Sequence, residues 1–121
     1  MNNQIVETQE FQILMQDAIE KSKQFGKVNE IRLKEMLYVY KVLQDLTKNT
    51  KAKVTYELHE DCKGMGAILI NAKKLSFTDF CQFDMVTSTA NNFEVYAKTN
   101  GTVQMNLAFY GLLNKEASSN E

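Results

Sequence analysis

The fold is decided by residues 92–110, NFEVYAKTNGTVQMNLAFY. Apolar and polar side chains alternate along both arms of this stretch, which is typical of strands with one buried face. A three-residue loop, Thr99-Asn100-Gly101, pairs Lys98 with Thr102 and keeps the apolar faces together, whereas a two-residue Asn100-Gly101 turn would mix them. We therefore predict an antiparallel hairpin with the longer loop. Its register sets Ala97, Val95 and Phe93 opposite Val103, Met105 and Leu107.

Two more strands are predicted upstream of the hairpin. Over residues 52–59 the period is again two, with Val54, Tyr56 and Leu58 on one face. Residues 61–64, Asp-Cys-Lys-Gly, are turn-like. Residues 65–71 are apolar on both faces, so we expect this strand to lie in the middle of the sheet.

The segment 72–82 has two interpretations. Ser76 followed by Asp79 resembles a capping box, which would start a short helix. The residues that come next alternate and are β-prone. We favour a bend over residues 72–79 and then a strand over residues 82–89.

Before residue 50 the apolar residues recur every three to four positions, which predicts helices. The first helix has Thr8 as a plausible N-cap and Gly26 as its C-terminal stop. Asp17 and Lys21 form a favourable pair on its wet face. Its apolar stripe comprises Phe11, Leu14, Met15, Ala18, Ile19 and Phe25.

The second helix begins after Asn29, a good N-cap, and runs to about Lys48. Its apolar residues form two faces, so we expect it to be covered on two sides, by the first helix and by a sheet or a second copy of the chain. One face has Leu33, Met36, Leu37, Tyr40 and Leu43, and the other has Ile31, Tyr38, Val39, Val42 and Leu46.

These patterns together predict one α+β domain over residues 1–121. An N-terminal helical hairpin packs on one face of a four- to five-stranded antiparallel sheet, giving two layers. Residues 1–7 and 114–121 are expected to be frayed tails.

The composition narrows the classes of partner. The 121 residues carry a net charge of −1, and Arg32 is the only arginine beside 13 lysines. Arginine is the side chain best suited to phosphate and guanine, so we predict no nucleic-acid binding. The N-terminus lacks a secretory pattern and no apolar run approaches the roughly 20 residues of a membrane span, so a cytoplasmic protein without membrane contact is expected. The lysine and asparagine bias suggests a bacterial or phage origin.

Reactive side chains are few. His59 and Cys62 have an acceptable spacing for metal ligands, but structural zinc sites usually show two such pairs. A thiol nucleophile at Cys62 would also need oxyanion donors and a group that orients the base. We therefore predict no catalytic residue and no cofactor, and keep a metal or thiol site at His59/Cys62 as an alternative.

The predicted sheet has a polar face opposite its helices. Tyrosine is favoured in recognition surfaces, because it buries much area at little rotamer cost. The simpler interpretation is the wet outer face of a two-layer domain. This face carries Thr55, Glu57, Tyr96, Lys98, Gln104, Asn106 and Tyr110, of which Thr55, Tyr96, Gln104, Asn106 and Tyr110 are the predicted binding residues.

The leading functional hypothesis is a non-enzymatic binding or accessory protein, of adaptor or inhibitor type, acting through protein–protein interaction. Self-association as a homodimer would use the second apolar face of the second helix. A second hypothesis is a small-ligand sensor that uses the polar sheet face at Tyr96, Asn106 and Tyr110.

Overall fold

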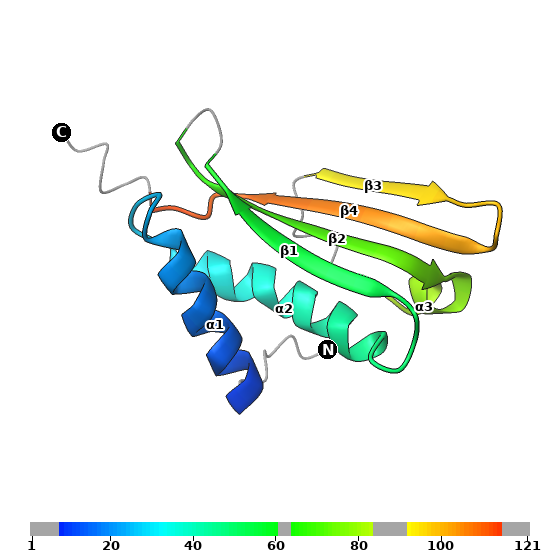
Figure 1. The fold of residues 1–121 in the computed structure, drawn as a ribbon. Coiled ribbons are helices and arrows are strands. Elements are labelled where there is room, and N and C mark those ends of the chain that lie inside the picture. Colours follow the sequence, from blue (N-terminus) through cyan, green and yellow to red (C-terminus); the bar gives the residue numbers. More distant parts are fainter. Residues whose placement is uncertain (1–7, 61–63, 84–91, 115–121) are drawn as a thin grey trace.

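The structure is a computed structural model that describes residues 8–60, 64–83 and 92–114. Its elements are α1 (Gln9–Ser22), α2 (Glu30–Leu46), β1 (Lys53–His59), β2 (Ala67–Ser76), α3 (Phe77–Gln82), β3 (Asn92–Ala97) and β4 (Thr102–Tyr110). The strands form one antiparallel sheet in the order β1-β2-β4-β3. Figure 1 shows α1 and α2 on one side of this sheet. The predicted α+β class is confirmed, with four strands in the described residues.

Both long helices begin where capping chemistry predicts. The hydroxyl of Thr8 accepts a hydrogen bond from the Phe11 amide at 3.1 Å, and the Asn29 side chain accepts one from the Arg32 amide at 3.2 Å. Each bond satisfies an amide that the first helical turn leaves unpaired. The end of α1 comes earlier than expected, at Ser22 rather than near Gly26.

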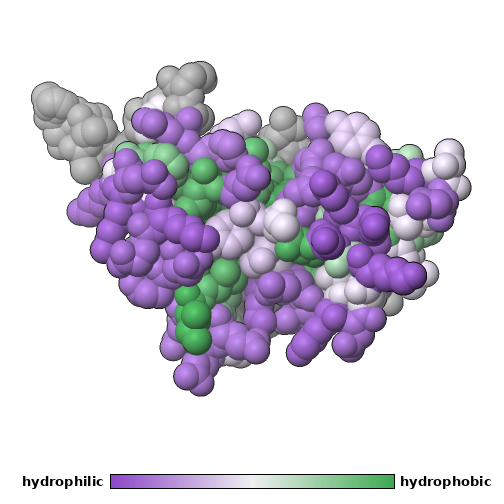
Figure 2. Space-filling view, viewed as in Figure 1, coloured by the Kyte–Doolittle hydropathy of each residue, from purple (hydrophilic) through white to green (hydrophobic). Residues whose placement is uncertain are grey.

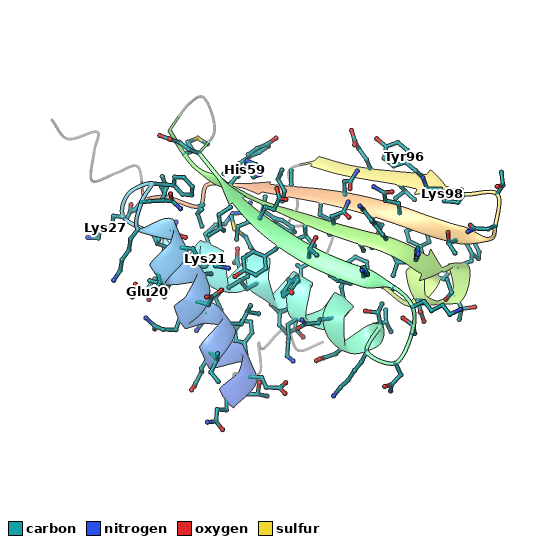
Figure 3. All side chains as sticks on the ribbon, viewed as in Figure 1. Glu20, Lys21, Lys27, His59, Tyr96 and Lys98 are labelled. Atoms are coloured by element: carbon teal, nitrogen blue, oxygen red, sulfur yellow. The ribbon has the colours of Figure 1, made fainter. Side chains whose placement is uncertain are left out.

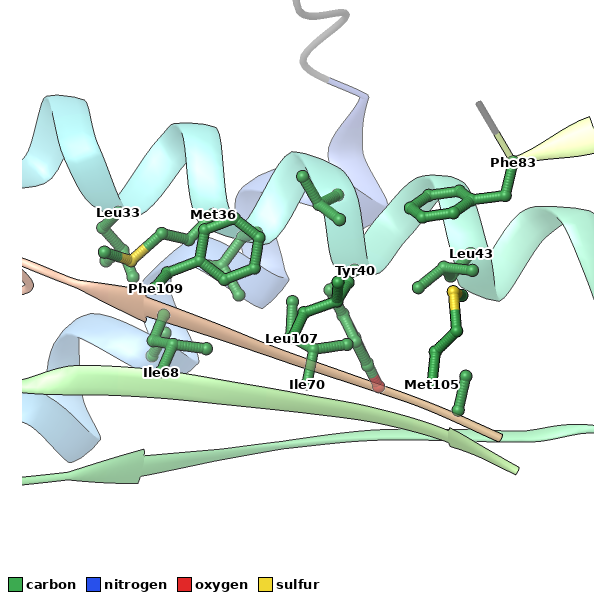
Figure 4. Packing of buried hydrophobic residues seen from close by; sticks show 14 of the residues in the cluster. Leu33, Met36, Tyr40, Leu43, Ile68, Ile70, Phe83, Met105, Leu107 and Phe109 are labelled. Carbon is green, nitrogen blue, oxygen red and sulfur yellow. The ribbon is translucent and has the colours of Figure 1, made fainter. Parts of the chain in front are cut away.

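The core lies between α2 and the inner face of the two central strands (Figure 4). The stripe that faces the sheet is buried along its whole length, as the helical period predicted. Burying one such large side chain contributes about 1.5–3 kcal/mol, so this contact dominates the stability of the fold. The helix contributes Leu33, Met36, Leu37, Tyr40 and Leu43, and the strands contribute Ile68, Ile70, Met105, Leu107 and Phe109.

The hairpin of β3 and β4 has the predicted register. The Lys98 amide donates to the Thr102 carbonyl at 2.8 Å, and the Gly101 amide donates to the Lys98 carbonyl at 3.2 Å. Gly101 has a φ of +82°, a conformation that costs glycine nothing. The requirement that each strand keep one apolar face was therefore sufficient to choose the loop length.

The predicted bend over residues 72–79 is wrong. Strand β2 continues to Ser76, but the pairing with β4 slips by one residue between Ala72 and Leu75. Lys74 has a φ of +60° within this bulge. The extra residue lets both Ala72 and Leu75 face the core, a change of phase that no simple alternation shows.

A short helix follows β2, as the Ser76/Asp79 capping box predicts and in place of the favoured bend. The Ser76 hydroxyl accepts a hydrogen bond from the Asp79 amide at 3.0 Å and so caps α3. Gln82, where a strand was expected to start, lies in this helix. The rest of that expected strand, residues 84–89, lies outside the described residues.

The chain after β4 is held from two sides. The Leu112 carbonyl accepts a hydrogen bond from the Asn29 amide at 2.9 Å, and the Leu113 amide donates to the Met65 carbonyl at 2.8 Å. Asn114, expected in the frayed tail, donates its amide to the Lys27 carbonyl at 2.7 Å. We call residues 111–114 the clamp, because they tie the loop between α1 and α2 to the start of β2.

A cluster of polar rings fastens α1 to β1. The Tyr56 hydroxyl donates to an Asp17 carboxylate oxygen at 2.9 Å, and the Lys21 ammonium lies 3.0 Å from the same carboxylate. The Tyr40 ring packs edge-on against Tyr56 with centroids 4.9 Å apart. Burial, and then the bond to Asp17, raises the pKa of Tyr56 above the usual tyrosine value.

The tight approach of the clamp predicts that Gly66 cannot be replaced. A Cβ at Gly66 would lie 2.9 Å from the Leu113 side chain, whereas one at Gly101 would meet nothing within 4 Å. Both glycines have a positive φ, so alanine should cost about 1–2 kcal/mol at either position through backbone strain. Crowding at Gly66 should add about 1–3 kcal/mol. Urea unfolding of Gly66→Ala and Gly101→Ala measures the difference, and equal losses would contradict the crowding.

The Tyr56 hydrogen bond predicts a loss of stability at alkaline pH. Above about pH 10 tyrosine ionises in the unfolded chain, whereas folded Tyr56 stays protonated because its pKa is raised. The free energy of unfolding should therefore fall as the pH rises from 8 to 11. Tyr56→Phe lacks the ionisable group and should lose less over this range in urea titrations. An identical pH dependence in both proteins would refute the assignment.

Candidate functional site

Among the described residues no helix lies over one face of the sheet, because both long helices pack on the other. Alternation along the four strands brings polar side chains to this uncovered side, and they line a hollow of about 570 Å³. We call this surface the open face. It comprises Thr55, Glu57, Leu69, Asn71, Lys73, Glu94, Tyr96, Gln104, Asn106, Ala108 and Tyr110.

A row of four polar residues crosses the middle of the open face, one from each strand. Thr55 pairs with Asn71, Asn71 pairs with Asn106, and Asn106 pairs with Glu94. The Asn71 amide nitrogen donates a hydrogen bond to the Asn106 side-chain oxygen. Both asparagines are half-buried. On the same face, the neighbouring pair along β2 and β4 is Leu69 and Ala108.

This bond uses one donor hydrogen and one acceptor oxygen of the two amides. The Asn71 side-chain oxygen and the Asn106 side-chain nitrogen make no hydrogen bond to another described residue. A primary amide has one acceptor oxygen and two donor hydrogens. The pair therefore presents an acceptor and a donor side by side in the floor of the hollow, which is the pattern that a peptide group or another amide can match.

Two tyrosines stand toward opposite ends of the open face. Tyr96 is 48% exposed, and its hydroxyl donates to a Glu94 carboxylate oxygen at 2.8 Å, which raises the pKa of Tyr96. Figure 3 shows Tyr96 on the side away from the helices. Tyr110 is half-buried, and its carbonyl accepts a hydrogen bond from Arg32 Nε at 3.0 Å. Leu69 adds an exposed apolar contact between them.

Four of the five predicted binding residues line the hollow together: Thr55, Gln104, Asn106 and Tyr110. The fifth, Tyr96, pairs with Gln104 on the neighbouring strand and lies beside the hollow. The predicted binding residues include none from β2, because the sequence pattern predicts a strand that is apolar on both faces. Asn71 between Ile70 and Ala72 was the signal that one face of β2 is polar.

The alternative metal or thiol site gains little from the structure. His59 Nε2 lies 2.9 Å from a Glu57 carboxylate oxygen at the surface, and Cys62 lies outside the described residues. Cys81 is exposed. No group of three or more histidine, cysteine or acidic residues within the described part could hold a metal ion.

The second apolar face of α2 is largely covered within the chain. Val39 is 1% exposed, while Tyr38, Val42 and Leu46 are partly buried against the core. Ile31, at 77% exposure, is the member of this face that remains in solvent. Self-association through this face of α2 could therefore bury only one exposed apolar side chain, Ile31, near the helix N-terminus.

A second hollow, of about 510 Å³, lies where the end of α2 meets β1. It is occupied by ion pairs, since the Lys41 ammonium contacts Glu10 at 2.8 Å and Asp45 at 3.0 Å. These carboxylates raise the pKa of Lys41. Lys48 also lines this hollow, so two ammonium groups balance the two carboxylates, and we interpret the arrangement as a tie between α1 and α2.

Comparisons with known proteins give no family. No protein-family model matches the chain, and neither does any curated protein or solved structure. None of the helices in the described residues is long and apolar enough to cross a membrane. The function has to be argued from the surfaces of the molecule.

The asparagine pair predicts an energetic coupling across the two central strands. Asn71→Ala and Asn106→Ala should each cost about 1 kcal/mol, and the double variant should cost little more than one of them, because both break the same bond. Urea unfolding of the four proteins gives a coupling of about 0.5–1 kcal/mol. Thr55→Ala combined with Asn106→Ala is the control, since those residues lie two strands apart and should add. Additivity at the asparagine pair would contradict the bond.

Proposed function

We propose that the chain is a non-enzymatic binding protein, of adaptor or inhibitor type, whose open face recognises a protein partner. The observation that carries the proposal is the asparagine pair, which offers an unused acceptor and donor in the floor of an uncovered hollow. Tyr96, Tyr110 and Leu69 supply contact area around it. A protein surface can cover all of these groups at once.

The shape of the open face favours a macromolecule over a small ligand. Its volume is within the range of about 300–1,000 Å³ typical of ligand pockets, but such pockets are mainly apolar and bury most of the ligand. Here Thr55, Glu57, Lys73 and Glu94 are all exposed. A small molecule would stay wet on one side, whereas a protein would exclude water from the centre.

The charges on the open face favour a partner of mixed polarity. Glu57 and Glu94 stand near Lys73, so neither sign dominates. The only arginine, Arg32, is occupied by the Tyr110 carbonyl, by Glu35 at 3.6 Å and by the Phe109 ring at 5.9 Å. Arginine is the side chain most suited to binding phosphate, and Arg32 instead makes contacts within the chain. This argues against a nucleic-acid partner. In Figure 2, hydrophilic side chains likewise cover most of the surface in view.

A small-ligand sensor is the second candidate function, and the volume of the hollow is the observation that favours it. We further propose that the protein is of bacterial or phage origin and acts in the bacterial cytoplasm. Self-association also belongs to the proposal, although α2 offers mainly Ile31 for it.

Site-specific photocrosslinking tests the proposed function. A benzophenone-bearing phenylalanine would replace Tyr96, Tyr110 or, as the control, the exposed Phe77 on α3 in cells that make the chain. We expect one partner protein, distinct from a second copy of the chain, to be crosslinked from positions 96 and 110 and not from position 77. Adding Asn106→Asp, which places a carboxylate beside Glu94, should reduce that adduct. Absence of adducts on the open face, or identical adducts at all three positions, would overturn the proposal.

The sensor alternative gives a different result. A metabolite or nucleotide that binds the native state should raise the melting temperature of the wild-type chain but not of Asn106→Asp. Such a shift without protein adducts would replace the protein partner by a small ligand.

A further inference from the structure

We infer that the free edge of β3 pairs with β3 of a second copy of the chain, so that two sheets join into one continuous antiparallel sheet. The inference rests on the self-association in the proposed function and moves it from α2 to the sheet edge. It does not depend on what binds the open face, so the two proposals can fail separately.

Strand β3 has the properties of an edge that can accept another strand. It is the last strand in the sheet order, so one side of its backbone has no neighbouring strand among the described residues (Figure 1). Its register with β4 is continuous, and the chain contains no proline. Natural edge strands are usually protected by a bulge, a proline or an inward-pointing charge. The bulge of this sheet is in β2, away from the edge.

Residues 94–97 of β3 are all exposed, which is unusual for a strand. Val95 is 38% exposed on the helix side of the sheet, and Tyr96 is 48% exposed on the open face. They are two of the three large apolar side chains that the described strands leave exposed, Leu69 being the third. Strand β1, the other edge, instead packs Val54, Tyr56 and Leu58 against the core.

The hydrogen-bonding phase of the hairpin fixes which backbone groups of β3 point outward. The Lys98 amide donates to the Thr102 carbonyl, so Lys98 faces β4. Hydrogen-bonded and non-hydrogen-bonded pairs alternate along an antiparallel ladder. Tyr96 and Glu94 therefore also bond to β4, while the amide and carbonyl groups of Val95 and Ala97 point to the free edge.

One register between the two β3 strands pairs the residues with outward backbone groups and also sets opposite charges across from each other. A two-fold axis at Tyr96 sets Val95 opposite Ala97 of the second copy, and these are the residues with outward backbone groups. The same register sets Glu94 opposite Lys98 of the second copy, and the two-fold axis creates this pair twice. A shift of two residues in either direction puts Tyr96 against one of these charges, and a larger shift puts Glu94 against Glu94 or Lys98 against Lys98. Opposite charges directly across a strand pair are favourable and like charges are not.

The pairing also joins the two open faces. Glu94, Tyr96 and Lys98 share a face, so the two copies of Tyr96 would be neighbours at the centre of the joined surface. Glu94, which already accepts a hydrogen bond from Tyr96, would gain an ammonium partner from the second copy.

Charge reversal on the full chain tests the register. Sedimentation equilibrium should show a dimer for the wild type, and Glu94→Lys or Lys98→Glu should each raise the dimer Kd at least about tenfold by creating two like-charge contacts. The double variant E94K/K98E restores opposite charges and should return the Kd to within about threefold of wild type. Glu57→Lys, the same change on the other edge strand, should leave it unaltered. A monomeric wild type at about 100 µM, or a double variant as weak as the singles, would overturn the inference.

A disulfide provides a second, independent measurement. In a non-hydrogen-bonded antiparallel pair the Cα atoms lie about 4.5 Å apart, within the reach of a disulfide. With Cys62 and Cys81 replaced by serine, Tyr96→Cys should oxidise to a covalent dimer, and Thr55→Cys on β1 should not. Equal crosslinking from both positions would contradict the two-fold axis at Tyr96. Photocrosslinking from position 110 in K98E then separates the proposals, because Lys98 does not line the hollow. Partner adducts from this monomeric variant would leave the open-face function standing.

Discussion

The packing of α2 on the inner face of β2 and β4 is the constraint on which the rest of the structure depends. Its buried stripe matches the inner side chains of the two central strands in length and is fully removed from water. Because α1 docks beside it on the same side, no helix is left for the other face. The polar character of the open face follows from this one-sided coverage. The hollow and the asparagine pair in its floor depend on it as well.

The parts of the structure that could be predicted are those in which neighbouring residues decide the conformation. Caps at Thr8 and Asn29 and the loop at Gly101 depend on a few adjacent side chains. The alternation in β4 was likewise enough to place Gln104 and Asn106 on the polar side.

The parts that could not be predicted depend on distant strands. The bulge in β2 exists because Ala72 and Leu75 both reach the core beside β4, and a period of two cannot express that phase change. The role of Asn71 likewise requires the sheet order, because only β4 as a direct neighbour brings Asn106 to it. A surface of alternating polarity was thus visible in the sequence, whereas the amide pair at its centre was not.

The clamp has a consequence for how the chain is made. The loop that joins α1 to α2 donates a hydrogen bond to the Leu112 carbonyl and accepts one from the Asn114 amide, and both residues are among the last described residues to be synthesised. Strands β2 and β4, which cover the apolar stripe of α2, follow this helix in the sequence, and β4 is the last described element. A nascent chain therefore emerges from the ribosome with both helices uncovered and can complete its native contacts only after residue 114 has left the exit tunnel. Until then the apolar stripe of α2 is exposed, and it offers a binding site to a ribosome-associated chaperone.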